Sequence, residues 1–237
     1  MVVEASAAFK TRFGTDPEVG GFAPGRINLI GEHIDYCDGF VLPMAIAFKA
    51  VCVGAKNGLG KCRVFAKDIG ATSEFELGEG GLPEKLPDDH PDRWSNYIRG
   101  VVAMMAKEGY PAECFDLLCT TNVPMGSGLS SSAALEVATA CFIGELMGHE
   151  IKGGKVTVAK ICQSAEHNYA GVMCGIMDQF ISAMGAEGNA LMIDCRSLDF
   201  ELVNTTKSRC PLHCVLRDTC FDRLDCMHHR CQSTIRP

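Results

Sequence analysis

Along the first part of the chain, apolar residues mainly follow the alternation that is typical of β-strands. Residues 4–13 are an exception, because Ala5, Phe9 and Phe13 follow helical spacing and predict an amphipathic helix. Strands are predicted where β-branched and aromatic residues gather between turn residues, over 19–33, 40–58, 62–68 and 72–77. Residues 78–92 are rich in Gly, Pro and acidic residues and are expected to form a surface loop.

The second part of the chain mixes helices with strands. Periodic apolar positions predict helices over 93–109, from about 130 to 148, over 156–171 and over 175–185. Strands are predicted over 114–123, 189–197 and 200–204. Strands followed by mixed helices and strands favour a two-layer α+β domain over regular βαβ winding.

Composition narrows the class of protein. The chain has 237 residues with 47% hydrophobic and 22% charged residues, which is ordinary for a globular protein. A formal net charge of -7 argues against nucleic-acid binding. The most apolar run, residues 39–55, is broken by Pro43 and Lys49 and predicts no membrane span. Residues 1–21 lack the apolar core of a secretory signal, so a cytoplasmic protein is expected.

The stretch PMGSGLSSSA, residues 124–133, runs from a predicted strand through a glycine turn into a predicted helix. Glycines allow close backbone approach, and the first N–H groups of a helix favour an anion. The serine hydroxyls could bind phosphate or ligate Mg²⁺. No Walker A lysine is present. We expect a phosphate cradle that also caps the helix; a well-capped helix without a ligand is the alternative.

A second group of polar residues is interspersed with short apolar stretches in GRINLIGEHIDYCDG, residues 25–39. Its members are Arg26, Asn28, Glu32, His33, Asp35 and Asp38. Alternation along a strand would place several of them on one face, where carboxylates and imidazole could accept the hydroxyls of a polyhydroxylated ligand. A hairpin turn with solvated charges is the alternative.

A third segment, SAEHNYAGVMCGIMDQF, holds residues 164–180. Glu166 is expected near the end of one helix, and Asp178 at the start of another. A carboxylate near a helix N-terminus is held ionised, as a cap or as a base. His167 is expected to form a structural hydrogen bond.

These motifs carry a resemblance to a known family. GRINLIGEHIDYCDGFVLPMAI resembles the galactokinase signature, PMGSGLSSSA the ATP-binding motif of the GHMP small-molecule kinases, and CGIMDQFISAMG the segment that holds the galactokinase catalytic aspartate. The resemblance covers residues 5 to 205. It implies a ribosomal-protein-S5-domain-2-like N-terminal domain over 1–205, and MgATP-dependent phosphorylation of galactose at the anomeric hydroxyl.

The resemblance also implies roles for individual residues. Asp178 and Arg26 match the catalytic pair. Galactose would be held by Arg26, Glu32, His33, Asp35, Gly175 and Asp178. The ATP phosphates would lie on Gly126, Ser127, Gly128, Leu129, Ser130, Ser131 and Ser132, with Trp94 near the adenine. Mg²⁺ would be ligated by Ser132 and Glu166.

Past residue 205 the resemblance ends, and residues 206–237 hold five cysteines in a composition unlike the rest. We expect this tail to be foreign to the fold; a zinc site is an alternative, although no C-x-x-C pair occurs. The family's C-terminal domain has no counterpart here. We therefore expect an exposed apolar face that favours association and weak or absent turnover. An N-acetylgalactosamine kinase and a non-catalytic galactose- or nucleotide-binding regulator are the alternative functions.

Overall fold

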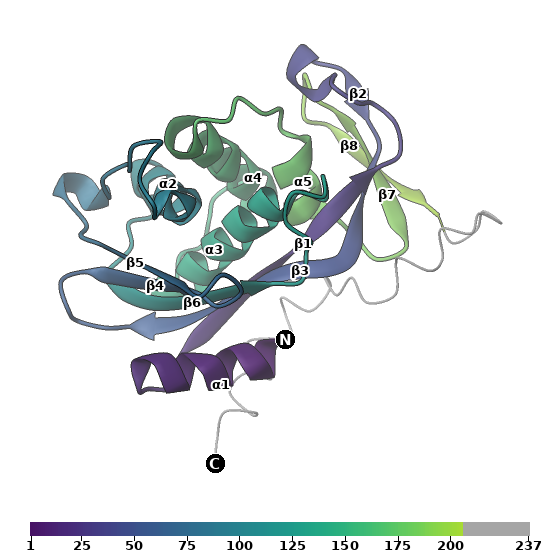
Figure 1. Ribbon diagram of the computed structural model, residues 1–237. Coiled ribbons are helices and arrows are strands. Elements are labelled where there is room, and N and C mark those ends of the chain that lie inside the picture. The colour runs from purple at the N-terminus through teal and green to yellow at the C-terminus, as the bar shows by residue number, and fades with distance from the viewer. Residues whose placement is uncertain (206–237) are drawn as a thin grey trace.

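A mixed five-stranded sheet forms the centre of the protein in the computed structural model, which describes residues 1–205 (Figure 1). Its strand order is β1-β3-β6-β4-β5. The strands are β1 (Val19–Asn28), β3 (Pro43–Lys56), β4 (Cys62–Ala66), β5 (Ala71–Phe75) and β6 (Phe115–Thr121). All neighbours pair antiparallel except β4 and β6, which pair parallel. The parallel pair requires a crossover, and α2 (Asn96–Lys107) lies within it.

Helices cover the two faces of the sheet unequally. In Figure 1, α2, α3 (Ser131–Met147), α4 (Gly154–Ala165) and α5 (Met177–Met184) lie on one face. The opposite face is covered by α1 (Val2–Phe13), which packs on β3 and β6 through Ala5 and Phe9, both fully buried. The mixed sheet and its helices confirm the predicted α+β class, but α1 on the second face adds a third layer to the two that the sequence predicted.

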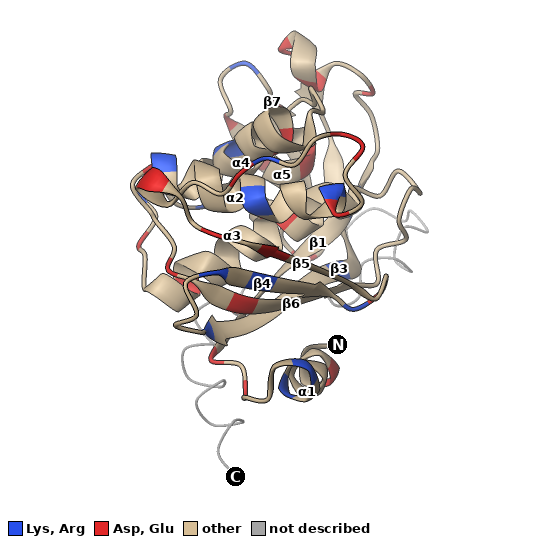
Figure 2. Cartoon of the chain, turned by 60° about the vertical axis from the view of Figure 1, so that its left-hand side comes forward, with Lys and Arg blue, Asp and Glu red and all other residues tan. Residues whose placement is uncertain are grey.

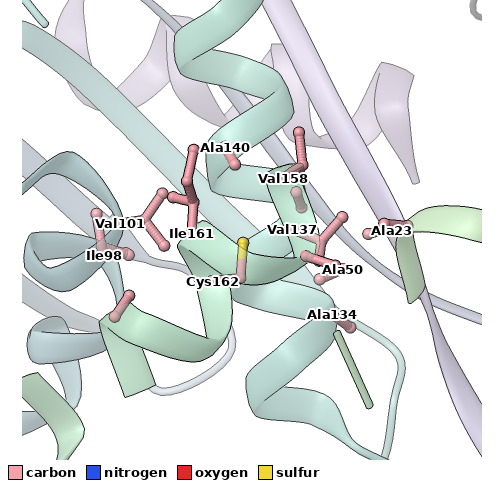
Figure 3. Packing of buried hydrophobic residues seen from close by; sticks show 14 of the residues in the cluster. Ala23, Ala50, Ile98, Val101, Ala134, Val137, Ala140, Val158, Ile161 and Cys162 are labelled. Atoms are coloured by element: carbon pink, nitrogen blue, oxygen red, sulfur yellow. The ribbon is translucent and has the colours of Figure 1, made fainter. Parts of the chain in front are cut away.

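The main core lies between the sheet and α3 (Figure 3). Ala134 and Val137 of α3 lie near Ala23 of β1 and Ala50 of β3, whereas Ala140 lies beside Ile161 of α4. On the other side of α3, residues of α2 and α4 complete the cluster, as Figure 3 shows for Ile98, Val101, Val158, Ile161 and Cys162. Small side chains at the α3–sheet contact let the helix approach closely, and this sets where the loop before α3 leaves the sheet.

A second, three-stranded sheet stands at the end of β1 and β3 (Figure 1). It pairs β2 (Phe40–Val41), β7 (Asn189–Asp194) and β8 (Phe200–Asn204), all antiparallel. Phe200 stacks edge-on against Phe180 of α5 with ring centroids 5.7 Å apart. All residues of β8 are nonetheless exposed, including Leu202 and Val203. The small sheet therefore presents apolar surface to the solvent.

The structure confirms the predicted order of helices and strands over residues 1–205, with three corrections. The strand expected over 19–33 ends at Asn28, and residues 29–33 form a turn. The stretch 40–58 splits into the short β2 and the long β3, and the helix expected over 156–171 ends as a π-helical turn, η4 (Glu166–Ala170). The interpretation of residues 206–237 lies outside the described residues. Within residues 1–205, no helix is long and apolar enough to cross a membrane. Acidic and basic residues are interspersed in the view of Figure 2.

Close packing of α3 predicts an unequal response to alanine at two adjacent glycines. A Cβ on Gly21 would overlap the carbonyl oxygen of Ala138 and lie 2.6 Å from the amide nitrogen of Phe142, both backbone atoms of α3. We expect Gly21→Ala to lower the free energy of unfolding by about 1–3 kcal/mol in urea denaturation. Gly20→Ala is the matched control, because its Cβ would meet its nearest neighbours at 3.2–3.3 Å. Equal effects of the two substitutions would contradict this account.

Candidate functional site

The glycine-serine loop lies between the end of β6 and the start of α3. Gly126 and Gly128 adopt left-handed backbone angles, with φ of 71° and 73°, so the loop depends on glycine at both positions. The Ser127 hydroxyl donates to the Pro124 carbonyl at 2.6 Å. No side-chain hydrogen bond caps α3, so its first N–H groups are open for an anion. The expectation that the serines also cap the helix is therefore wrong.

An ion pair joins the start of α5 to the central sheet. Arg26 of β1 donates from Nε to Oδ1 of Asp178 at 2.7 Å and from a terminal nitrogen to Oδ2 at 2.8 Å. The pair is about three-quarters or more buried, with side-chain exposures of 16% and 24%. A planar guanidinium matches a carboxylate in this two-pronged geometry. The structure thus brings together two residues 152 positions apart that the sequence assigned to one catalytic pair.

The glycine-serine loop contacts both members of that pair. Arg26 donates its other terminal nitrogen to the Gly128 carbonyl at 2.5 Å, and the Ser130 hydroxyl donates to Oδ2 of Asp178. The backbone N–H of Arg26 also donates to the Leu129 carbonyl at 3.0 Å. A β-bulge between Pro24 and Arg26 shifts the register of β1 at this point. The loop, β1 and the start of α5 therefore meet at one ion pair.

Asp35 lies beside the same end of α5. A Cβ on Gly175 would overlap the Asp35 carboxyl group, so only glycine fits at this contact. Burial, followed by the negative charge of Asp178, raises the pKa of Asp35, while the backbone N–H of Met177 is among the groups that lower it. Asp35 and Gly175 also line an open cavity of about 660 Å³ that His167 borders. The His167 ring bonds to the Cys174 carbonyl at 2.7 Å, as a structural histidine would.

Glu32 and His33 lie in the exposed turn that follows β1. Glu32 accepts a hydrogen bond from Asn28 at 2.8 Å, and the His33 ring contacts the Tyr36 hydroxyl at 3.0 Å. Within residues 1–205, neither side chain bonds to Arg26 or Asp178. The structure therefore places these two predicted sugar contacts on the same loop as Asp35, each bonded to a neighbour in that segment.

A buried carboxylate cluster lies behind the start of α3. Glu166 is 5% exposed and accepts a hydrogen bond from Gln179 Nε2 at 2.5 Å, and the nearby Ser132 hydroxyl is among the groups that lower its pKa. The same Gln179 nitrogen lies 3.2 Å from Oε2 of Glu136, which is fully buried in α3. Burial, then the charges of Glu166 and Asp178, raise the pKa of Glu136 well above its usual range. Burial also raises the pKa of Glu166.

The Ser132 and Glu166 pair suits a magnesium ion better than it suits a softer metal. Mg²⁺ prefers oxygen ligands and is commonly bound by one or two carboxylates together with substrate phosphates and waters. Among the described residues, no group of three or more His, Cys, Asp or Glu side chains could hold a metal by itself. The site therefore fits an ion that a phosphate ligand helps to hold.

An apolar cavity opens on the other side of the loop. It has a volume of about 220 Å³ and is lined by residues that include Ile69, Trp94, Met125, Ser131 and Ser132. Nε1 of Trp94 is buried and finds no hydrogen-bond partner within residues 1–205. An unpaired indole N–H beside an apolar cavity is costly unless a ligand or water accepts its hydrogen bond.

Sequence reasoning missed two members of the carboxylate cluster. Glu136 and Gln179 are both fully buried, and each keeps one oxygen without a partner among the described residues. A signal for Glu136 was available, because it is the one charged residue between Ser131 and Gly144 in an otherwise apolar helix. Gln179 follows Asp178 directly and carried no comparable signal.

Comparison with known proteins places this architecture in a class. Residues 96–186 match the family model for the GHMP kinases N terminal domain. The mevalonate kinase of Methanococcus jannaschii shares the fold, with a TM-score of 0.65 at 18% identity over 78% of this chain and 56% of that chain. The family match and the shared fold therefore assign the GHMP kinase N-terminal domain to this part of the chain.

Within that class the chain resembles the N-terminal half of galactokinases. Residues 7–56 match the galactokinase galactose-binding signature. The chain is 44% identical to a galactokinase of Homo sapiens over 205 residues, which is 86% of this chain and 51% of the human protein. A galactokinase of Pasteurella multocida is 40% identical over 82% of this chain and 49% of its own length. The structure of Lactococcus lactis galactokinase complexed with galactose matches with a TM-score of 0.75 at 33% identity, over 86% of this chain and 52% of that chain. The chain thus spans about half the length of the curated relatives it matches.

The raised pKa of Glu136 predicts a pH-dependent stability. The folded state holds this proton to a higher pH than the unfolded chain, in which glutamate titrates near pH 4.3 (roughly). The stabilisation is therefore complete below about pH 4.3 and is lost as the pH rises toward the folded pKa. Glu136→Gln keeps a neutral side chain of the same shape, so its stability should not fall in this way. We expect the free energy of unfolding of Glu136→Gln, relative to that of the unsubstituted protein, to rise by about 1 kcal/mol or more from pH 5 to pH 8.

Urea denaturation at both pH values measures this difference. Glu145→Gln, on the exposed side of the same helix, is the control and should leave the pH dependence unchanged. An equal change in free energy for Glu136→Gln at pH 5 and pH 8 would show that Glu136 does not titrate in this way.

Proposed function

We propose that this chain is a galactokinase-type sugar kinase domain that binds galactose and MgATP and directs phosphoryl transfer to the anomeric hydroxyl of galactose. The observation that supports it most is the Arg26–Asp178 pair, held at the point where the glycine-serine loop meets the start of α5. Phosphoryl transfer needs alignment and charge neutralisation more than covalent chemistry. A carboxylate beside a phosphate-binding loop could position the sugar hydroxyl, while the loop positions the ATP phosphates.

The sugar would lie against Asp178, with Asp35 and the backbone of Gly175 on the other side. Asp178 is placed to accept the proton of the attacking hydroxyl, and Arg26 would stabilise the resulting negative charge on the oxygen. Glu32 and His33 would complete the sugar contacts from the exposed turn. The galactose named with the Lactococcus lactis structure, at 33% identity, supports galactose as the substrate class.

The ATP phosphates would lie on residues 126–132. The left-handed glycines expose backbone there, and the open N–H groups of α3 point at the same place. Mg²⁺, held by Ser132 and Glu166, would neutralise charge on the phosphates. The apolar cavity beside Ser131 would take the adenine ring, with the unpaired N–H of Trp94 at its wall.

We further propose that residues 1–205 form one ligand-binding domain that acts in the cytoplasm and turns its substrates over weakly when alone. Its relatives are about twice as long, so their other half would supply the rest of the cleft. The exposed apolar residues of β8, Phe200, Leu202 and Val203, would then favour association with another apolar surface.

Tryptophan fluorescence tests the nucleotide site. Trp94 is the only tryptophan in the chain, so the emission of the protein reports on the 220 Å³ cavity. We expect MgADP to change that emission in a saturable way, because a bound base would alter the polarity around the indole. Trp94→Phe should lose the signal while keeping its circular dichroism spectrum. If calorimetry detects MgADP binding without any change in emission, the nucleotide binds elsewhere.

An ADP-release assay with galactose and MgATP tests the reaction itself. We expect weak turnover from residues 1–237, and a loss of about 100-fold or more in Asp178→Ala, because a positioned base contributes about that factor. Asp16→Ala, an exposed residue beyond α1, is the control and should keep the activity.

Thermal unfolding separates binding from catalysis in the same samples. Galactose at about 100 times its Kd should stabilise the folded chain by about 2.7 kcal/mol, and MgADP should do the same. Stabilisation by galactose without turnover would favour the binding role over catalysis. A larger rise in stability with N-acetylgalactosamine than with galactose would identify N-acetylgalactosamine as the substrate. No rise with either sugar or with MgADP would contradict the proposal.

A further inference from the structure

Ser130 directs its hydroxyl away from the helix that it precedes. It occupies the N-cap position of α3, where a serine side chain ordinarily accepts a bond from the helix backbone. Here the hydroxyl donates to Oδ2 of Asp178 instead, and the residue is 8% exposed. The interaction joins positions 48 residues apart, so it links two segments of the fold rather than closing a local turn.

The backbone of Ser130 is held in an unfavourable conformation. Its φ of 58° lies in the left-handed region, which costs free energy for a residue with a Cβ. The same loop uses glycine at its other left-handed positions, Gly126 and Gly128. A strained non-glycine residue persists when its surroundings require its side chain. Here the side chain is required for the hydrogen bond that the Ser130 hydroxyl donates to Asp178.

Neighbouring residues of the loop attach to the other half of the ion pair. The Gly128 and Leu129 carbonyls accept from the Arg26 side chain at 2.5 Å and from its backbone N–H at 3.0 Å. A Cβ on Gly25 would lie 2.6 Å from the Leu129 carbonyl, so the loop sits directly on β1. Three consecutive loop residues, 128 to 130, therefore contact Arg26 or Asp178.

From these contacts we infer that Ser130 is a positioning residue that couples the nucleotide and sugar sites. This inference rests on the proposed function. Phosphates that order residues 126–132 would also fix the hydroxyl of Ser130, and through it the carboxylate that faces the sugar. Arg26 bonds Asp178 directly through two nitrogens, and Ser130 adds the contact that the loop side chains make with the carboxylate itself. Ordering one site then lowers the cost of ordering the other.

The coupling is measured as the change in galactose affinity that MgADP produces. By calorimetry on residues 1–237, we expect saturating MgADP to lower the galactose Kd by about fivefold or more, the low end of typical coupling. By reciprocity, galactose should tighten MgADP binding by the same factor. In Ser130→Ala the factor should fall below about twofold, while each ligand still binds alone.

A second variant separates the hydroxyl from the backbone strain. Ser130→Gly also lacks the hydroxyl but accepts the left-handed conformation, so its Tm should exceed that of Ser130→Ala by about 2–4 °C. Both variants should lose the coupling equally. Retained coupling in Ser130→Gly would assign the effect to backbone strain and overturn the role of the hydroxyl.

Ser182→Ala is the matched control. Ser182 lies one turn beyond Asp178 in α5, and its buried hydroxyl donates to the Pro24 carbonyl at 2.7 Å. This substitution should lower the Tm yet leave the coupling factor unchanged, because Ser182 does not touch the carboxylate. Full coupling in Ser130→Ala, or no coupling in the unsubstituted protein although both ligands bind, would overturn the inference. Failure of the unsubstituted protein to bind galactose would instead contradict the proposed function.

Discussion

The two-pronged ion pair between Arg26 and Asp178 is the interaction on which the candidate site depends. It ties the central sheet to the start of α5 at distances of 2.7 and 2.8 Å, in a partly buried setting where a lone charge would be costly. Removing either partner would leave the other charge uncompensated. Because Gly128 and Ser130 attach to the same pair, its geometry also decides where the glycine-serine loop can lie.

Close packing behind the pair sets its position. The α3 helix rests on β1 and β3 across glycine and alanine, so a side chain added at Gly21 or Gly54 would collide with backbone or with the Phe142 ring. The N-terminus of α3 is thereby brought over the edge where β1 carries Arg26. Tight contact between a helix and a sheet transmits small displacements rather than absorbing them. The site therefore inherits its precision from the core rather than from the exposed loops around it.

The sequence predicted the elements and the chemistry more completely than it predicted their contacts. Glycine turns and helix periodicity predicted the elements because these signals are local, and the family resemblance of three motifs implied that Arg26, Asp178 and the glycine-serine loop share one site. The direction of the Ser130 hydroxyl was not predictable in this way, since serine before a helix usually caps it. Only the fold brings Asp178 within its reach.

The buried carboxylates also illustrate the difference between local signals, which the sequence shows, and contacts in space, which it does not. Glu136 is a charged residue in an otherwise apolar helix. Its neighbours along the chain do not indicate that Gln179 bonds to it and to Glu166 in the folded protein. Burial is the main cause of the raised pKa of Glu136 and of Glu166, and repulsion from the neighbouring acids adds to it. Under the proposed function, a divalent ion at Ser132 and Glu166 would relieve that repulsion, so charges that disfavour folding would favour binding of a metal-nucleotide complex. On this proposal stability and ligand affinity would oppose each other at the cluster, which is the trade-off expected of a binding site.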